Sequence, residues 1–205
     1  MKSNVINQGL IVEISQDTHL QTWLEGFLID RKAQTMSKGT IRFYKKKLSL
    51  FSHYCEIQAI SYITQITHQT LREFLVWLEQ RGHNPGGIRA FYRAVKTFLF
   101  WWESEVELEG WNNPIRKVKA PKMAIAPLQG IKLSDFQAIL DACKSKRDRA
   151  ILFCLLDTGA RASEFCSMDV EDLDRVFGSI LIKLGKGKKP RTVFLGEKAR
   201  RSIRA

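Results

Sequence analysis

Hydrophobic positions in the first half of the chain recur every three or four residues, which is the spacing of one buried face of an α-helix. A first helix is predicted from about residue 18, and a polar break at residues 34–39 ends it. Thr40 and Thr67 can each cap a following helix, and a turn-forming cluster at residues 82–87 precedes a fourth. We therefore predict a four-helix domain, whose buried faces are Leu20, Trp23, Leu24, Phe27 and Leu28; Ile41, Tyr44, Leu48 and Phe51; Leu71, Phe74, Leu75 and Leu78; and Ile88, Phe91, Val95, Phe98, Leu99 and Trp102.

The pattern changes on either side of these helices. Residues 1–16 alternate weakly and are expected to form an arm, whereas prolines interrupt the basic stretch after residue 109. Beyond that stretch, Ser134 opens a capping-box pattern, a second helix follows at residues 147–156, and a short helix is predicted from Ser163. The domains predicted from this organisation are 1–109, a basic linker at 110–130, and 131–205.

The end of the chain predicts a β-hairpin followed by a helix. Residues 179–184 and 191–195 are short runs with β-branched or alternating residues, and Gly185, Lys186 and Gly187 lie between them. Glu197 then begins a basic helical segment. The first half is thus purely helical, and the second half is predicted to mix helices with a hairpin.

Charge narrows the choice of partner. The 205 residues carry a net charge of +12 with a pI near 9.7, and residues 179–205 contain nine basic side chains and one acidic one. Such a localised surplus favours a polyanionic partner, either nucleic acid or an anionic membrane surface. No run of about 18 apolar residues predicts a spanning helix, and the N-terminus lacks a signal-peptide core, so the cytoplasm is the expected location.

The cysteines and histidines predict no metal site. The four cysteines form no C-x-x-C pair, and no histidine lies beside them at ligand spacing. We therefore interpret the cysteines as reduced, packed side chains and assign the histidines no role.

Two helices of the first domain carry basic faces. The basic residues of the second helix are clustered at its start, and those of the fourth helix recur at helical spacing opposite much of its apolar face. Such faces suit contacts with phosphates along a duplex, although surface charge that only promotes solubility is the alternative. The candidate DNA-binding residues here are Lys38, Arg42, Lys45 and Lys46, then Arg89, Arg93 and Lys96.

Arg161 is the strongest candidate for a residue that takes part in catalysis. It follows an apolar helix and the break at Thr158 and Gly159, so its side chain can project from the junction into a cleft. A guanidinium can bind two phosphate oxygens and stabilise the charge that develops in a phosphoryl-transfer transition state. Glu164 lies three residues further on and can orient it. The alternative is an ordinary helix-terminal arginine paired with Glu164.

Lys186 lies between two glycines at the predicted hairpin tip. Glycines there permit close approach to a ligand, and a lysine could contact DNA or protonate a leaving oxygen. The alternative is a solvated turn lysine. Several further cations extend the patch, and their mutual repulsion favours an anionic partner; they are Lys183, Lys188, Lys189 and Arg191.

These segments resemble the tyrosine recombinases, or phage integrases, in their Xer-like bacterial form. Residues 158–165, TGARASEF, resemble the family's T-G-[LM]-R-x-S-E-L box, and residues 185–195, GKGKKPRTVFL, resemble its G-K-G-x-K-x-R-x-V-P-L hairpin. The first domain resembles the family's four-helix SAM-like core-binding domain. The resemblance implies a mainly α protein, with that domain followed by the N-terminal part of an α+β catalytic domain with a β-hairpin.

The resemblance also implies a mechanism and partners. Family members clamp double-stranded DNA, and a tyrosine forms a 3′-phosphotyrosyl link without a metal or nucleotide cofactor. Arg161 would be the first phosphate-binding arginine, Lys186 the general acid and Glu164 a supporting carboxylate. Family members act as tetramers on paired sites, so other recombinase protomers are further possible partners.

Some residues depart from the family pattern. Ala160 replaces a larger apolar residue, and Phe194 stands where proline is usual. The family's His-x-x-Arg box and its nucleophile follow the hairpin, whereas all four tyrosines here precede residue 93. We therefore expect a truncated recombinase that binds DNA and lacks the covalent step. The alternatives are a binding-only module that occupies recombination sites or partners an intact recombinase, and a helical interaction protein whose basic patch aids solubility.

Overall fold

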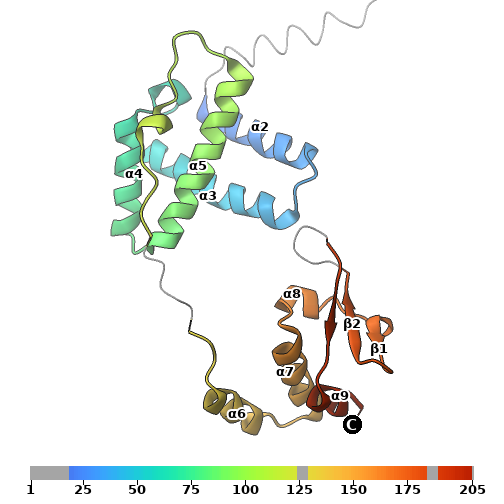
Figure 1. The fold of residues 1–205 in the computed structure, drawn as a ribbon. Helices are drawn as coiled ribbons and strands as arrows, with labels where there is room; N and C mark the ends of the chain where they lie inside the picture. Colours follow the sequence, from blue (N-terminus) through green and yellow to red (C-terminus); the bar gives the residue numbers. More distant parts are fainter. Residues whose placement is uncertain (1–18, 124–128, 184–188, 205) are drawn as a thin grey trace, which may run out of the picture. The chain divides into compact units, whose positions relative to one another are not determined.

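The computed structural model describes residues 19–123, 129–183 and 189–204. The chain divides into two compact units, residues 1–126 and residues 127–205 (Figure 1). The arm expected at residues 1–16 and the tip of the expected hairpin lie outside the described residues.

The first unit is helical, and the predicted four-helix domain is confirmed. Two short 3₁₀ turns accompany the α-helices, one between the second and third helices and one after the last (Figure 1). The elements are α2 (Leu20–Ala33), α3 (Lys38–Ile57), η1 (Ile63–Gln65), α4 (His68–Gln80), α5 (Pro85–Val106) and η2 (Pro114–Lys117).

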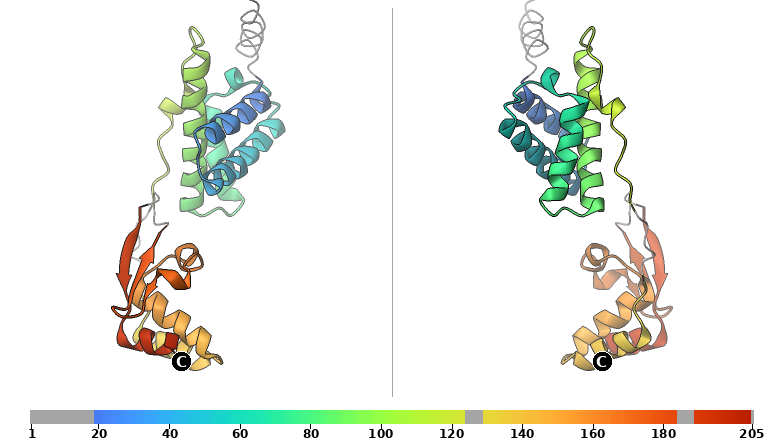
Figure 2. Two further views of the ribbon diagram at one scale, coloured as in Figure 1. Left: turned by 90° about the vertical axis from the view of Figure 1, so that its right-hand side faces the viewer. Right: turned by 90° about the vertical axis from the view of Figure 1, so that its left-hand side faces the viewer.

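Aromatic side chains fill the centre of this unit. Phe27 and Phe98 are fully buried and meet edge to face, with ring centroids 5.7 Å apart. Phe51 and Phe74 form a second such pair at 5.0 Å, which joins α3 to α4. The long helix α5 packs against α2, α3 and α4, and Figure 2 shows it beside α4 in both views. Edge-to-face pairs add about 0.5–1.5 kcal/mol each to the burial of apolar area.

Polar caps set the helix starts. The Ser37 hydroxyl accepts the Thr40 amide at 3.1 Å, so α3 begins three residues earlier than predicted and Thr40 lies within its first turn. Thr67 caps α4 as predicted. Asn84 caps α5, and Pro85 occupies its first position, where a missing amide hydrogen costs nothing.

The start of the predicted linker belongs to the first unit. Buried Asn113 donates to the Leu99 carbonyl at 3.1 Å, and the Tyr92 hydroxyl donates to the Val118 carbonyl at 2.9 Å. Ile115 and Val118 are buried in the same core. Residues 113–118 lack helical periodicity because they include a short 3₁₀ turn, which such hydrogen bonds hold against α5.

The second unit combines short helices with a three-stranded antiparallel sheet in the order β1-β2-β3 (Figure 1). The predicted hairpin strands and the helix from Glu197 are confirmed, whereas the two-residue strand β1 was not predicted. Lys132 is the N-cap of the first helix, so Ser134 lies inside it and the predicted capping box is wrong. The elements are α6 (Leu133–Ala142), α7 (Lys146–Thr158), α8 (Ala162–Phe165), η3 (Val170–Asp172), β1 (Leu173–Asp174), β2 (Ser179–Ile182), β3 (Arg191–Phe194) and α9 (Glu197–Arg204).

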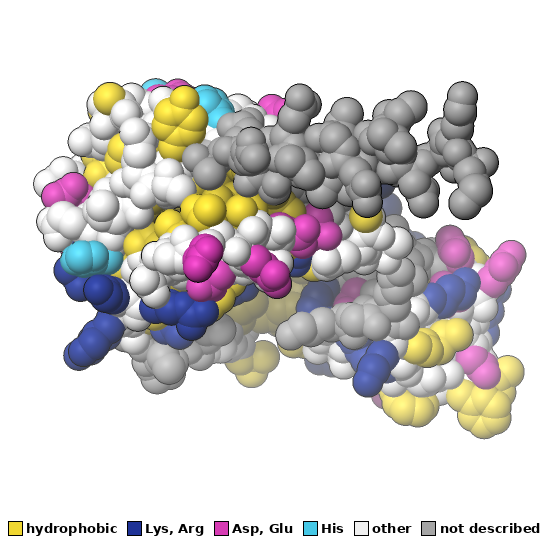
Figure 3. Space-filling model, turned by 90° about the horizontal axis from the view of Figure 1, so that it is seen from above, with side chains coloured by type: hydrophobic (Ala, Val, Ile, Leu, Met, Phe, Trp, Pro, Cys, Tyr) yellow, Lys and Arg dark blue, Asp and Glu magenta, His cyan; other side chains and the backbone are white. Residues whose placement is uncertain are grey.

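The core of the second unit is small. Its central buried side chains are Cys154, Ile180, Leu195 and Ala199, whereas Phe177 is 74% exposed. Figure 3 shows further hydrophobic side chains, coloured yellow, exposed on the molecular surface. Among the described helices of either unit, none is both long and apolar enough to cross a membrane.

Candidate functional site

A glycine break positions Arg161. Helix α7 ends at Thr158, and Gly159 follows in the left-handed region with φ of 55°, as the sequence predicts for a helix break. Ala160 follows, and Arg161 is the N-cap of α8 with extended backbone angles. The guanidinium is therefore carried at a junction between two helices, and its side chain is 57% exposed.

Glu164 is the buried partner of Arg161. Its side chain is only 3% exposed, and one oxygen accepts the backbone amide of Arg161 at 2.9 Å. The other oxygen, Oε1, accepts Arg161 Nη1 at 2.7 Å. This contact fits the orienting role predicted for Glu164, and Nη2 and Nε of Arg161 have no protein acceptor among the described residues.

A second arginine shares the same carboxylate. Arg191, at the start of β3, donates through Nη1 to Glu164 Oε1 at 3.1 Å and through Nη2 to Oε2 at 2.8 Å. Sequence reasoning placed Arg191 in the basic patch but missed this pairing across 27 residues. The only signal in the sequence is an acidic residue, Glu164, near several basic ones, and this does not identify Arg191 as its partner.

The two arginines keep Glu164 ionised. Its pKa falls to about 2, chiefly because Arg191 donates to the carboxylate and the Arg161 amide donates as well, with burial opposing both effects. The pKa of Arg191 is raised by the same pairing. The cluster thus contains two cations and one anion at any pH in the physiological range.

The cluster borders a shallow cationic depression of about 490 Å³, lined by Gly159, Arg161, Lys189, Pro190 and Arg191. Among the described residues its lining contains three cations and no carboxylate, since Glu164 is buried against the two arginines. A depression of this kind suits an anion with several oxygens, since guanidinium groups bind such oxygens in a bidentate manner. Lys186 and Lys188, both predicted for this site, lie outside the described residues.

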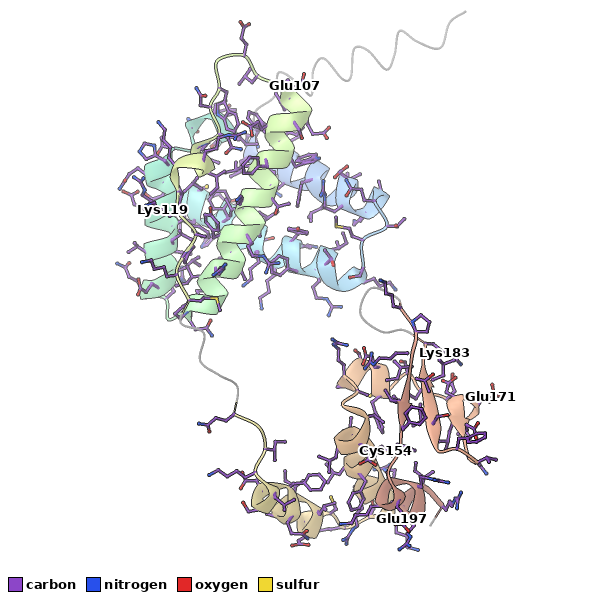
Figure 4. All side chains as sticks on the ribbon, in the orientation of Figure 1. Glu107, Lys119, Cys154, Glu171, Lys183 and Glu197 are labelled. Atoms are coloured by element: carbon purple, nitrogen blue, oxygen red, sulfur yellow. The ribbon has the colours of Figure 1, made fainter. Side chains whose placement is uncertain are left out.

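Lys183 has a separate partner. It follows β2 directly, and its Nζ lies 2.6 Å from Asp172 Oδ1 in η3. Figure 4 labels Lys183 at this position and shows Glu171 of η3 in the same part of the second unit. Lys183 therefore does not line the depression that contains Arg161.

The seven candidate DNA-binding residues of the first unit are all exposed. In the part of the chain that the structure describes, none of them forms an ion pair with a carboxylate. Lys96 lies near the Phe100 ring at 5.6 Å. They are Lys38, Arg42, Lys45 and Lys46 on α3, and Arg89, Arg93 and Lys96 on α5.

Lys47 differs from its neighbours on α3. It is half-buried, and its Nζ lies 3.7 Å from the centroid of the Phe91 ring on α5. Burial, and then the nearby charge of Lys46, lower the pKa of Lys47. Lys47 thus joins α3 to α5, and the exposed lysines beside it remain available to solvent.

Models of two domains of one protein family match this chain. The N-terminal SAM-like domain of phage integrases matches residues 20–105, and the phage integrase family model matches residues 130–205. The two matches cover most of both units in the family's order. The chain therefore belongs to the phage integrase family, which is the family of the tyrosine recombinases.

Individual relatives agree with this assignment. The chain is 27% identical over 187 residues to tyrosine recombinase XerC of Oceanobacillus iheyensis, covering 88% of this chain and 59% of the relative. It is 25% identical over 186 residues to tyrosine recombinase XerD of Staphylococcus saprophyticus, covering 88% and 61%. The chain thus spans about 60% of the length of these curated relatives.

Solved structures show the same fold. A lambda integrase tetramer bound to a Holliday junction matches with a TM-score of 0.76 at 15% identity, covering 95% of this chain and 56% of that one. The Tn1549 transposon integrase in complex with a circular intermediate DNA matches with a TM-score of 0.73 at 13% identity, covering 92% and 64%. The order of a SAM-like helical unit and a partly β unit is therefore that of integrases.

Proposed function

We propose that this protein binds double-stranded DNA as the core-binding and partial catalytic region of a site-specific tyrosine recombinase. The observation that carries the proposal is the depression lined by Arg161, Lys189 and Arg191, whose two arginines are held by the buried carboxylate of Glu164. The pairing with Glu164 fixes the two guanidiniums before any ligand arrives, which reduces the entropy lost on binding a phosphate. Relatives in this family that bind DNA support the choice of ligand.

The basic faces of α3 and α5 would supply most of the affinity. Pairing with a carboxylate costs a cation part of its attraction for a phosphate, because the carboxylate balances part of its charge. The seven exposed cations of these helices carry no such cost within the described chain, so each can replace a condensed counterion of the duplex. We propose that they contact phosphates along the DNA and fix its position without reading its sequence.

Arg161 would bind the scissile phosphate in the complete reaction. Its Nη2 and Nε have no protein acceptor among the described residues, and its exposed side chain lines the depression. Lys186 is proposed as the general acid, with Lys188 and Lys189 as further DNA contacts and Glu164 as the group that orients Arg161. Strand transfer through a phosphotyrosine intermediate, on sites shared with other recombinase protomers, completes the proposal, and such DNA binding would place the protein on the nucleoid.

A binding-only role is the second candidate, and the positions of the tyrosines favour it. All four lie in the first unit, where Tyr54 and Tyr92 are buried and the Tyr92 hydroxyl is held by the Val118 carbonyl. A polypeptide of these 205 residues would then occupy a site without cutting it. Incubation with a nicked suicide substrate separates the two roles, because only a nucleophile near the Arg161 depression yields a covalent protein–DNA adduct.

Fluorescence anisotropy with a labelled 30-base-pair duplex tests the DNA-binding proposal. We expect binding at about 50 mM salt that weakens by roughly 10³-fold or more at about 200 mM, which corresponds to six or more phosphate contacts. An Arg161→Ala variant should bind more weakly at every salt concentration, because it removes a cation from the depression. The proposal is refuted by affinity that does not change with salt, or by no binding at about 50 mM.

A further inference from the structure

Two buried carboxylates in the second unit have the same local geometry. Glu164 is the third residue of α8 and accepts the amide of Arg161, its N-cap residue. Asp172 is the third residue of η3 and accepts the amide of Asp169, its N-cap residue, at 3.0 Å. Each carboxylate thus closes the first turn of a short helix and retains acceptor capacity for a side chain from another element.

Each carboxylate uses that capacity on a cation from a different strand. Glu164 accepts Arg191 at the start of β3, and Asp172 accepts Lys183 immediately after β2. The Asp172 side chain is 4% exposed and its contact with Lys183 is 2.6 Å long, so this pair is not a loose surface contact. The contact lowers the pKa of Asp172 and raises that of Lys183, which keeps both groups charged.

The two cations lie at the same end of the β2–β3 ladder. Ile182 is directly opposite Arg191 in the antiparallel register, and Lys183 is the next residue along the chain. Two ion pairs, from α8 and η3, therefore hold the strand ends nearest the cationic depression. The pairing at the other end of the ladder continues to Ser179 and Phe194.

We propose that Asp172 and Lys183 form a positioning pair, which holds the end of β2 so that β3 presents Lys189 and Arg191 to DNA phosphate. This inference rests on the proposed DNA binding. It gives Lys183 a different role from the neighbouring cations of the basic patch: its ammonium group is directed to a buried carboxylate and acts on DNA only through the strand. Asp172 would then support DNA binding although its charge repels DNA.

The direction in which one substitution changes DNA affinity distinguishes this proposal from a direct contact between Lys183 and phosphate. Asp172→Asn raises the net charge by one, so simple electrostatics predicts tighter binding to DNA. If Lys183 were itself a phosphate ligand, losing Asp172 would free it and would also tighten binding. The positioning pair predicts the opposite, a weakening of about threefold to tenfold, because Lys183 loses its buried acceptor and the strand end loses its anchor.

Asp169 supplies a matched control. Its carboxylate lies 3.8 Å from Lys183 and is 71% exposed, so Asp169→Asn makes the same change in charge at almost the same place without removing the short contact. We expect Asp169→Asn to leave affinity unchanged or slightly increased. Lys183→Arg retains a donor for Asp172 and should keep near-normal affinity, whereas Lys183→Gln should bind as weakly as Asp172→Asn.

The experiment is duplex binding by the full chain at fixed salt, combined with hydrogen exchange. Exchange should increase at the amides of β2 and β3 near Ile182 and Arg191 in Asp172→Asn, while amides of α7 and α9 keep their protection, which excludes general unfolding. The proposal is overturned if Asp172→Asn binds DNA more tightly than the parent, or if exchange at the strand ends does not change. If the parent itself does not bind DNA, the proposed function fails, and the exchange data still decide whether the pair holds the strand.

Discussion

The paired substitution of Arg89 and Arg93 by alanine tests whether the first unit contacts phosphates. Both side chains are exposed on α5, and neither forms an ion pair in the described part of the chain. Alanine favours helix formation at least as well as arginine, so the variant should keep α5 intact. Any loss of DNA affinity then reports lost charge rather than lost structure.

The expected magnitude follows from counterion release. Each phosphate contact contributes about −0.9 to the slope of log affinity against log salt concentration, so two lost contacts make the slope shallower by about 1.8. Across a fourfold rise in salt, from about 50 to about 200 mM, the advantage of the parent over the variant should therefore shrink by about twelvefold. A loss of affinity that did not depend on salt would require another cause.

Anisotropy titrations at four or more salt concentrations measure both slopes. The matched control replaces Lys144 and Lys198, which removes the same charge from exposed positions of the second unit outside the depression. We expect the control slope to differ from the parent by less than about 0.5. An unchanged slope in the Arg89 and Arg93 variant, or an equal change in the control, refutes the assignment of α5 to the DNA-binding surface.

Three further predictions concern stability and reactivity. The pKa of the Glu164 carboxylate is about 2 in the folded chain against 4.5 ordinarily, so its ionised form stabilises the fold. This stabilisation is complete above about pH 4.5 and is lost as the pH falls towards 2. Thermal melts should therefore show Glu164→Gln less stable than the parent at pH 7, with the difference closing at low pH. Phe98→Ala should lower the free energy of unfolding of the first unit by about 3–5 kcal/mol in urea titrations, because the ring is fully buried against Phe27. A thiol reagent should modify exposed Cys166 quickly and Cys55 only on unfolding, because burial raises the pKa of the Cys55 thiol to about 12; equal rates would contradict this.

The helices of the first unit could be predicted because their apolar faces are long and regular. The same pattern could not choose between Ser37 and Thr40 as a cap, since both hydroxyls lie within one turn and contact each other at 2.9 Å. Strand β1 escaped prediction because it spans only two residues and forms through pairing with β2. Residues 113–118 fall within the predicted linker because their contacts with α5 are made by backbone carbonyls and buried side chains that have no helical spacing.

For the candidate site, the sequence predicted the local features and missed the long-range ones. The glycine break and the contact between Arg161 and Glu164 arise within six residues, so spacing alone was sufficient. The two hydrogen bonds from Arg191 to Glu164 require the sheet to place β3 beside α8, and no local sequence pattern encodes that placement. Asp169 and Asp172 close the first turn of η3, and the partner of Asp172, Lys183, is identifiable only in three dimensions.

The two units hold their cations in different ways, and this difference predicts separate contributions to DNA binding. In the first unit, cations such as Arg93 are exposed and unpaired within the described residues, so each can exchange a counterion for a phosphate and affinity should depend steeply on salt. In the second unit, Arg161 and Arg191 are already held by a buried carboxylate, which lowers their net attraction for an anion but fixes where a phosphate must lie. Glu164→Gln should therefore disturb placement of the phosphate with little change in salt slope, whereas Arg93→Ala should change the slope with little effect on placement. Salt titration combined with footprinting at single-nucleotide resolution distinguishes these outcomes, and a shared effect of both substitutions on the slope would show that the division of roles is wrong.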